Sequence, residues 1–256
     1  MKGKNHILKK INESKDILWL SFPALEKFDF LQQGLILKNK AENLFSDRAK
    51  LKKDLAGSLK TLTGHKGLNL YANQVHKNRC AVVDSPAVVR NWDYNYEYDA
   101  FITNQPKVCL TVRVADCLPI YLVEPGTKVI GLIHAGWRST LLRIIDSTLE
   151  QMQANFDVKI SNLRAVIGPG LGPDCFEISE ELAILFPPES VLSENNGRPK
   201  LDLAHVNLKQ LLNSGLKPDS ITILSECTHC NPLLYHSFRR SADKNQRMVA
   251  FMGLKG

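Results

Sequence analysis

Three apolar segments of this chain each lead to a side chain that can bind a transition metal. The segment 108–123 is interrupted by Ala-Asp-Cys-Leu-Pro with Cys117 at its centre, and the segment 128–134 ends in His134, followed by Ala-Gly-Trp-Arg. An earlier apolar run is followed by His76. Short apolar runs bounded by loop-forming residues are typical of buried strands. We therefore expect strands that carry a thiol and two imidazoles at their ends, and we expect these three groups to meet.

The rest of the chain predicts strands and helices in irregular alternation with short connections, which favours antiparallel or mixed sheets. We interpret residues 1–256 as a single α+β domain in which 1–15 form a peripheral segment. The expected strands are 16–22, 68–76, 81–83, 108–114, 119–123, 128–134, 163–167, 221–225 and 247–253. The expected helices are 46–60 with Ser46 near its N-cap, 139–155 with Ser139 as its cap and Leu142 buried, a short helix after Ser179, and 203–214. The segment 84–100 is expected to be a long loop over the site, and Gly168–Pro173 a rigid turn that walls a pocket.

Composition excludes several classes of protein. The net charge of +7 is spread over separated lysine patches, without the aromatic-interleaved basic stripe that binds single strands, so no nucleic-acid partner is expected. No apolar run approaches the roughly 20 residues that span a bilayer, so no membrane association is expected. Polar residues stand near the N-terminus where a secretory signal is apolar, and we expect a cytoplasmic protein.

The six cysteines do not suggest a disulfide scaffold in a chain of this length. Cys80 and Cys109 lie beside apolar residues and are interpreted as reduced thiols of the core. Cys227 and Cys230 flank His229 in a Cys-x-x-Cys arrangement that could bind a metal or cycle between redox states. Because no second cysteine pair follows nearby, a structural zinc is not expected there.

Two imidazoles and one thiolate suit a catalytic zinc, which takes three protein ligands and keeps the fourth position for water or substrate. Such an ion lowers the pKa of bound water and polarises an electrophile. Arg138 stands just before the predicted helix start at Ser139, where backbone N–H groups and the helix dipole favour an anion. That placement suggests phosphate or carboxylate binding, and the alternative is an arginine that only packs on Trp137.

These motifs and their order resemble the YfiH-like family, first called laccase-domain or multicopper polyphenol oxidoreductases and later described as purine nucleoside phosphorylases. The resemblance is clearest over residues 46–254. Its elements are Asn73-Gln74-Val75-His76, Ala115-Asp116-Cys117-Leu118-Pro119, His134-Ala135-Gly136-Trp137-Arg138, Ile167-Gly168-Pro169, Gly172-Pro173-Asp174-Cys175-Phe176-Glu177, Cys227-Thr228-His229-Cys230 and Ser237-Phe238-Arg239-Arg240.

The resemblance implies a zinc centre made by His76, Cys117 and His134. It implies a domain whose mixed sheets pack together between helices, a fold shared with some bacterial toxin deamidases. It also implies phosphorolysis of adenosine, inosine, guanosine and methylthioadenosine, and hydrolytic deamination of adenosine. Copper-dependent oxidation is the less expected alternative, because scattered histidines do not supply the additional ligands of a multicopper centre.

The sequence departs from the family pattern at several places that bear on the pocket wall. The family's amino-terminal His-Gly-Phe motif is replaced around Gln32–Lys38. Lys77 and Ser139 each occupy a position that is usually glycine, and Gln246 replaces the glycine expected before Arg247.

The leading hypothesis is therefore a zinc-dependent purine nucleoside phosphorylase that acts on a purine nucleoside and phosphate, with adenosine deamination as a further activity. A metal-free hydrolase or amidase with Cys117 as nucleophile is one alternative. A degenerate family member acting as a binding protein, for example in cell-wall quality control, is another. The oligomeric state is left open. Catalytic roles are assigned to His76, Cys117, His134 and Arg138, and substrate-binding roles to Gln74, Arg113, Asp116, Ser139, Arg239 and Arg240.

Overall fold

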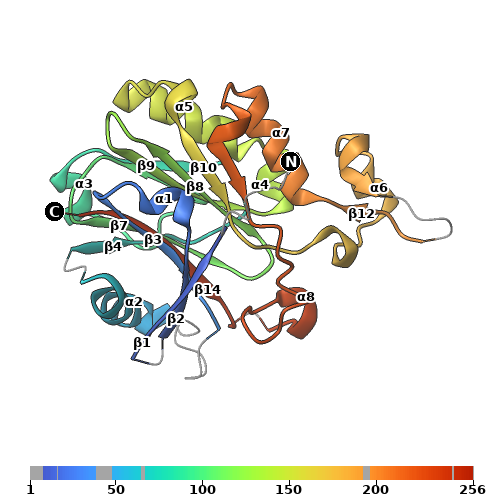
Figure 1. The fold of residues 1–256 in the computed structure, drawn as a ribbon, viewed down its shortest axis with the longest axis horizontal. Helices are drawn as coiled ribbons and strands as arrows, with labels where there is room; N and C mark the ends of the chain where they lie inside the picture. The colour runs from blue at the N-terminus through green and yellow to red at the C-terminus, as the bar shows by residue number, and fades with distance from the viewer. Residues whose placement is uncertain are drawn as a thin grey trace, which may run out of the picture.

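The computed structural model describes residues 8–15, 17–38, 48–64, 67–192, 197–243 and 245–255, apart from the side chains of 48–52. Two six-stranded sheets lie face to face between helices (Figure 1). The first sheet has the order β1 (Lys10–Ser14), β2 (Ile17–Ser21), β3 (Leu31–Ile36), β14 (Met248–Leu254), β7 (Val108–Val114) and β4 (Leu68–Leu70). The second has the order β13 (Ile221–Ile223), β10 (Arg164–Ile167), β8 (Leu118–Glu124), β9 (Val129–Ala135), β6 (Ala100–Thr103) and β5 (Cys80–Val83).

Both sheets are mixed, which confirms the expected α+β fold with mixed sheets between helices. Most neighbours pair antiparallel, whereas β4 with β7, β5 with β6 and β10 with β13 pair parallel. A two-stranded ladder, β11 (Val191–Leu192) with β12 (Lys200–Leu201), lies beside them.

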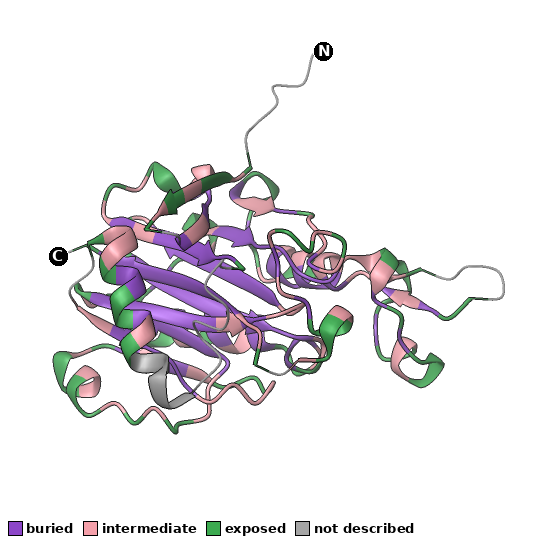
Figure 2. Cartoon of the chain, turned by 90° about the horizontal axis from the view of Figure 1, so that it is seen from below, coloured by how far each residue is buried: buried purple, intermediate pink, exposed green. Residues whose placement is uncertain are grey.

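Helices cover the outer face of each sheet (Figure 1). The helix α2 (Arg48–Thr63) lies on the first sheet and buries Leu55 and Leu59 there, while its outer side is exposed (Figure 2). On the second sheet α5 (Ile144–Phe156) buries Ile145, Leu149 and Met152, and α7 (Leu203–Asn213) packs beside it. The shorter helices are α1 (Pro23–Glu26), α3 (Pro86–Arg90), α4 (Trp137–Leu141), α6 (Glu180–Ala183) and α8 (Phe238–Ser241).

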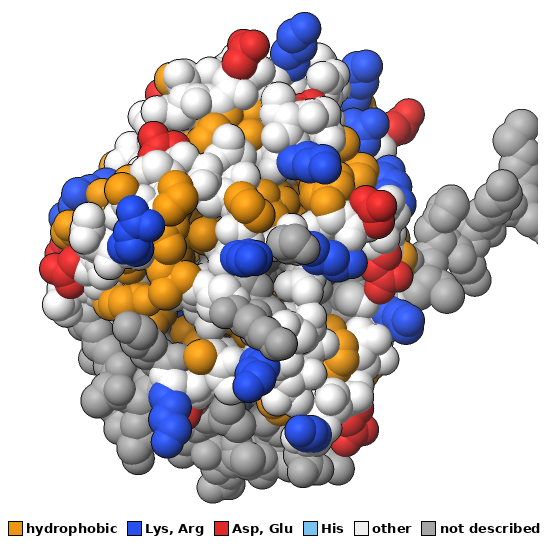
Figure 3. Space-filling view, turned by 90° about the vertical axis from the view of Figure 1, so that its left-hand side faces the viewer, with side chains coloured by type: hydrophobic (Ala, Val, Ile, Leu, Met, Phe, Trp, Pro, Cys, Tyr) orange, Lys and Arg blue, Asp and Glu red, His pale blue; other side chains and the backbone are white. Residues whose placement is uncertain are grey.

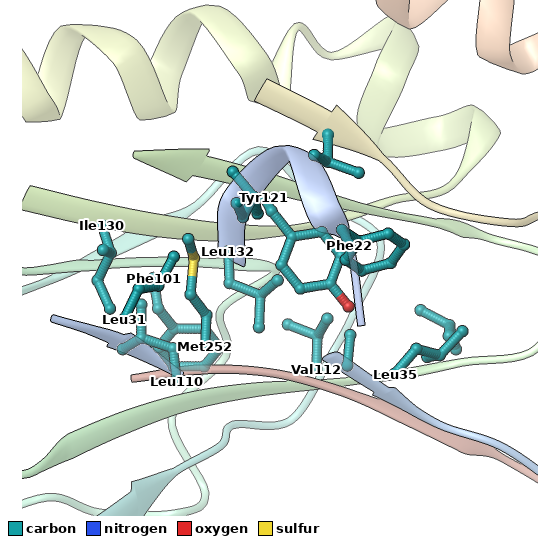
Figure 4. Packing of buried hydrophobic residues seen from close by; sticks show 14 of the residues in the cluster. Phe22, Leu31, Leu35, Phe101, Leu110, Val112, Tyr121, Ile130, Leu132 and Met252 are labelled. Atoms are coloured by element: carbon teal, nitrogen blue, oxygen red, sulfur yellow. The ribbon is translucent and has the colours of Figure 1, made fainter. Parts of the chain in front are cut away.

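The main core fills the space between the two sheets. Inward residues of both sheets, among them Leu35, Val112 and Leu132, interdigitate with Tyr121 (Figure 4). Tyr121 is fully buried, and its hydroxyl donates to the carbonyl oxygen of Gly34 in the opposite sheet at 2.8 Å. A buried tyrosine hydroxyl needs such a partner, so this bond fixes the two sheets against each other as well as satisfying the polar atom.

Several expected elements differ in the structure. The strand expected over 68–76 ends at Leu70, and the segment 84–100 contains α3 rather than being loop throughout. The helix expected to start at Ser139 is two helices, because Arg143 adopts a left-handed backbone (φ 61°) between α4 and α5. That break leaves Leu142 exposed rather than buried. The strands β1, β3 and β6 were not predicted, and the predicted cap Ser46 lies outside the described residues.

The surface shows no concentration of positive charge on the face drawn in Figure 3, where Lys and Arg side chains stand apart among polar and apolar groups. Among the described residues, no helix combines the length and apolarity needed to cross a bilayer.

Candidate active site

The three predicted ligands do converge. In the β8–β9 hairpin Leu118 pairs with Ala135, the last residue of β9. Cys117 therefore lies beside the end of β9, close to His134. The Cys117 Sγ is 3.9 Å from Nε2 of His76, although the two residues are 41 positions apart. The ligand atoms of His76, Cys117 and His134 all lie within 4.8 Å of one another. Three separate segments therefore deliver two imidazoles and a thiol to one point.

A buried carboxylate that the sequence analysis did not single out organises this cluster. Asp99 directly precedes β6 and is fully buried. Its oxygens accept backbone N–H groups from three consecutive residues, Val75, His76 and Lys77, at 2.9–3.2 Å. Its Oδ1 also lies 2.9 Å from Nδ1 of His134. One side chain thus holds the His76 loop, where His76 has a positive φ of 59°, and orients the His134 ring.

The charges of the cluster are coupled. Burial acts to raise the pKa of Cys117, but the adjacent His134 and His76 outweigh it and lower that pKa to about 6. Burial acts to lower the pKa of His134, but Cys117 and Asp99 raise it to about 9. Burial likewise opposes ionisation of Asp99, yet His134 and the loop N–H groups keep its pKa below the ordinary value. The thiolate is therefore the stable form of Cys117 near neutral pH.

The residues present fit a transition metal. The donor set is one thiolate and two imidazoles, which matches three-ligand zinc sites. The bond from Asp99 to Nδ1 of His134 leaves Nε2 of that ring as the ligand atom, the usual arrangement behind metal-bound histidine. Gly136 leaves room for the side chains of Cys117 and His76 to approach each other. A Cβ at this position would stand 3.0 Å from both the Cys117 sulfur and Cδ2 of His76.

A cavity of about 490 Å³ opens onto the cluster. Its described lining combines cationic and apolar side chains. The cationic ones are Arg113, Arg138, Arg239 and Arg247, and the apolar ones include Trp137, Leu171, Phe176, Leu203 and Phe238. Asp116 is the one carboxylate in the described lining, so the charge of the cavity is strongly positive. Such a pocket suits a ligand with an anionic part and a flat apolar part.

Gln74 and Asp116 line the cavity and also tie its loops together. The side-chain amide of Gln74 exchanges two hydrogen bonds with the backbone of Arg113, at 2.8 and 2.9 Å. The carboxylate of Asp116, in a left-handed backbone (φ 82°), accepts from the hydroxyl of Thr228 and the backbone N–H of Arg239, both at 2.6 Å. Asp116 therefore links the Cys117 loop to two segments near the C-terminus.

The four remaining predicted substrate-binding or phosphate-binding residues are placed differently. Arg138 is exposed, lines the cavity, and lies over Trp137 with its guanidinium carbon 4.1 Å from the ring centroid. The contact with Trp137 is thus present, and phosphate binding stays a prediction. Ser139 is fully buried outside the described lining, and its hydroxyl accepts the Gly136 N–H at 2.9 Å. It is the third residue of the five-residue α4 and not its cap. Arg239 lines the cavity. The guanidinium of Arg240 donates to the backbone oxygens of residues 228, 229 and 235 and lies outside that lining.

Arg247 is a cavity residue that the sequence analysis did not assign. Its guanidinium lies 5.9 Å from the Phe238 ring centroid and donates to the backbone oxygens of Asp243 and Gln246. The only signal in the sequence was its place beside the altered position Gln246.

The departures from the family pattern lie outside the cavity lining. Lys77 points to Glu97 at 3.7 Å, and Gln246 meets His236 at 3.3 Å. The altered amino-terminal motif lies mostly in β3, where Gln33 exchanges hydrogen bonds with the backbone of Phe22. None of these positions is among the described lining residues, so the changes alter the support of the fold and not the cavity surface.

Fold and cluster together define a two-sheet α+β protein with a Cys-His-His ligand set at the base of an arginine-lined cavity. The chain belongs to the family described as multi-copper polyphenol oxidoreductase laccase, whose model matches residues 27–255.

Curated relatives carry enzyme names. Purine nucleoside phosphorylase YlmD of Geobacillus stearothermophilus is 35% identical over 60% of this chain and 59% of its own length, so the match spans less than two thirds of that protein. Purine nucleoside phosphorylase YlmD of Bacillus subtilis is 30% identical over 73% of this chain and 70% of its own. A protein named adenosine deaminase RL5, from an unknown prokaryote, is 28% identical over 65% and 68%. The crystal structure of YlmD from G. stearothermophilus superposes with a TM-score of 0.84 over 97% of this chain and 99% of that one, at 26% identity.

Proposed function

We propose that this protein is a zinc-dependent purine nucleoside phosphorylase. The observation that carries the proposal is the placement of His76, Cys117 and His134 in a cavity that also presents four arginines and an apolar wall. The names of the relatives point in the same direction. Phosphorolysis needs both parts of this cavity, because its substrates are an anion and a purine ring.

The three ligands would hold zinc, which when bound supplies a Lewis acid next to the substrate. Copper fits this set less well, because the described residues offer only two imidazoles and one thiolate at this point. Asp99 acts through the ligands. It fixes the His134 ring and the His76 loop, so it is a positioning residue.

Arg138 is the residue best placed to bind phosphate. It is exposed and lines the cavity, its guanidinium stacks on Trp137, and that guanidinium donates no hydrogen bond to any other described residue. Arg113 and Arg247 add positive charge from the neighbouring walls, as does Arg239, although part of its guanidinium already donates to backbone oxygens at Cys175 and Glu177. Hydrogen bonds between a guanidinium and a phosphate are charge-assisted, and such bonds are stronger than hydrogen bonds between neutral groups.

Phosphorolysis requires only the nucleoside and phosphate as reactants. An oxygen of hydrogen phosphate attacks C1′ of the ribose, the C1′–N9 bond breaks, and its electron pair leaves with the purine, which takes up the proton that the phosphate loses. The products are ribose 1-phosphate and the free base. Phe176, Phe238 and Leu171 provide the apolar surface for the purine. Gln74, Asp116, Ser139 and Arg240 are assigned to holding the loops rather than to contacting the reacting atoms.

The test is phosphate-dependent release of free base by the zinc-loaded protein from adenosine, inosine, guanosine and methylthioadenosine. We expect release that requires both phosphate and zinc and that is lost in Cys117→Ala together with the metal. Base release that proceeds equally without phosphate, or no release from any of the four nucleosides, contradicts the proposal. Ammonia release from adenosine in the same assay tests the deaminase reaction to which the name of one relative points.

A second candidate function is a metal-free cysteine hydrolase, and one observation favours it. Asp99, His134 and Cys117 stand in the order carboxylate, imidazole and thiolate, which is the arrangement of an activated nucleophile. Zinc retained in stoichiometric amount by protein purified without added metal counts against this reaction, since a ligated thiolate does not attack. Alkylation of Cys117 by iodoacetamide at a rate unaffected by chelator supports it.

A further inference from the structure

A second group of sulfur and nitrogen ligands lies outside the cavity lining. Cys175 ends the short turn Pro173–Cys175, and Cys227, His229 and Cys230 share the turn that follows β13. The sulfur atoms of Cys175 and Cys230 are 3.3 Å apart although the residues are separated by 55 positions. The ligand atoms of Cys175, His229 and Cys230 all lie within 4.8 Å of one another.

Cys227 lies in the same turn, beside this group but not among the three whose ligand atoms are all within 4.8 Å of one another. Its sulfur accepts the backbone N–H of Gly172 at 3.2 Å. Gly172 allows this approach, because a Cβ there would stand 2.9 Å from the Cβ of Cys227. The two contacts at Gly172 therefore hold the Cys227 side chain against the segment that carries Cys175.

We propose that Cys175, Cys227, His229 and Cys230 form a second, structural zinc site. Three thiolates and one imidazole are a closed four-ligand set of the kind that structural zinc takes. Sulfurs at about 2.3 Å from a tetrahedral ion stand about 3.8 Å apart, so the 3.3 Å pair needs to open by only about half an ångström. A disulfide between Cys175 and Cys230 is the competing chemistry. It would use two of the four groups and would not involve Cys227 or His229.

The site would fasten the segment 227–230 to a segment that walls the cavity. Gly170 and Cys227 already form a parallel bridge, in which Thr228 N–H donates to the Gly170 oxygen at 2.8 Å. The segment around Cys175 carries Leu171 and Phe176, which line the cavity. The zinc would therefore connect residues far apart in the sequence and hold this wall in place. The Cys-x-x-Cys pair alone did not predict such a site, because the third sulfur comes from Cys175, which lies far from it in the sequence.

Zinc stoichiometry of the full chain tests the proposal. Purified, desalted protein is expected to hold about two zinc ions, one for each ligand set. The double variant Cys175→Ser/Cys230→Ser is expected to hold about one, and so is Cys117→Ser. Cys80→Ser, a half-buried cysteine outside both groups, is the matched control and keeps both ions.

Cobalt gives a readout that does not depend on activity. In the Cys117→Ser background the cobalt-loaded chain is expected to show the intense thiolate charge-transfer and tetrahedral bands of a sulfur-rich site, which weaken on adding Cys230→Ser. Cys230 is exposed, so this single change spares the core. A wild-type chain with one zinc, lost entirely in Cys117→Ser, overturns the proposal. So does a Cys175–Cys230 disulfide in protein alkylated at lysis. Neither result bears on phosphate-dependent base release, so the second zinc site can be disproved while the proposed phosphorylase function stands.

Discussion

The Asp99 carboxylate and the His134 imidazole form a buried pair, with Oδ1 2.9 Å from Nδ1. The backbone also joins them, because the N–H of His134 donates to the Asp99 carbonyl at 2.7 Å. The same carboxylate gathers three N–H groups of the His76 loop. Two of the three candidate metal ligands are thus positioned by one side chain, and the effects of changing it should appear in metal binding.

Asp99→Asn should lower the affinity for zinc by about 10- to 100-fold, the usual effect of losing a partner behind a metal ligand. The amide cannot accept all the hydrogen bonds that the carboxylate accepts, and it removes the negative charge beside His134. Competition with a chromophoric chelator measures the affinity. Asp84→Asn, at an exposed position outside the cavity lining, is the control and should leave the affinity unchanged. Equal affinities for the two variants would contradict the positioning role of Asp99.

Metal-depleted protein should react with iodoacetamide at Cys117 in a pH-dependent manner that differs from an ordinary thiol. The pKa of Cys117 is lowered to about 6, against burial, by His134 and His76. The thiolate fraction, and hence the alkylation rate, should therefore rise as pH increases through about 6 and level off before pH 8. His134→Gln should move the midpoint upward. Mass spectrometry of the peptides identifies the labelled residue.

Cys109 provides the internal comparison for this experiment, because burial raises its pKa to about 12. It should remain unlabelled over the same pH range in the folded chain. A Cys117 midpoint near 9 would show that the histidines do not stabilise the thiolate.

Gly136→Ala should weaken metal binding with little change in folding. The backbone at Gly136 (φ −88°, ψ 172°) is open to any residue, so no strain arises from its dihedral angles. The added Cβ would lie 3.0 Å from the Cys117 sulfur and from the His76 ring. In the metal-free chain the side chains of Cys117 and His76 can move away from the added methyl group, whereas zinc draws them together. The cost of displacing packed groups, about 1–3 kcal/mol, therefore falls on the zinc-bound state and corresponds to about a 5- to 150-fold loss of zinc affinity. Isothermal titration with zinc measures it.

Gly57→Ala is the matched control, because a Cβ at this exposed position of α2 meets nothing within 4 Å. It should leave zinc binding unchanged and raise the free energy of unfolding by about 0.5–1 kcal/mol, since alanine favours the helix. A zinc affinity unchanged in Gly136→Ala would show that the ligands do not close over this glycine.

The sequence predicted the hairpin β8–β9 and the strands β7, β10, β13 and β14, because each is a run of apolar residues between turn-forming ones. It did not predict β3, whose Leu-Gln-Gln-Gly start looks solvated. The fold buries this strand at the centre of a sheet, where Gln33 is satisfied by the backbone of Phe22. The strand β6 was missed for a similar reason, since it follows a segment rich in Asn, Asp and Tyr.

The three candidate ligands were identifiable because each lies in or after an apolar run. Pairing of β8 with β9 brings Cys117 and His134 together, whereas His76 lies in a loop beyond the end of β4 and is held there by Asp99. Asp99 was not identifiable, because a carboxylate in a polar segment looks exposed until the neighbouring strand and the His76 loop close around it. Arg138 lines the cavity, but the helix dipole invoked from the sequence does not explain its position there. The helix that begins there is only five residues long, so Trp137 and the cavity wall hold the guanidinium rather than a long helix dipole.

Arg138→Ala should impair the use of phosphate more than the use of nucleoside. Hydrogen bonds to charged groups contribute about 1.5–3 kcal/mol, so the KM for phosphate should rise about 10- to 100-fold while the KM for inosine changes little. Arg138→Lys should recover part of the loss, because it keeps the charge but not the planar fork that stacks on Trp137. Initial rates over a grid of phosphate and inosine concentrations separate the two constants. Arg90→Ala, at an exposed position of α3 outside the cavity lining, controls for the loss of a surface arginine. An equal rise of both KM values in Arg138→Ala would mean that this arginine shapes the cavity as a whole, and a rise in neither would move phosphate binding to Arg113 and Arg247.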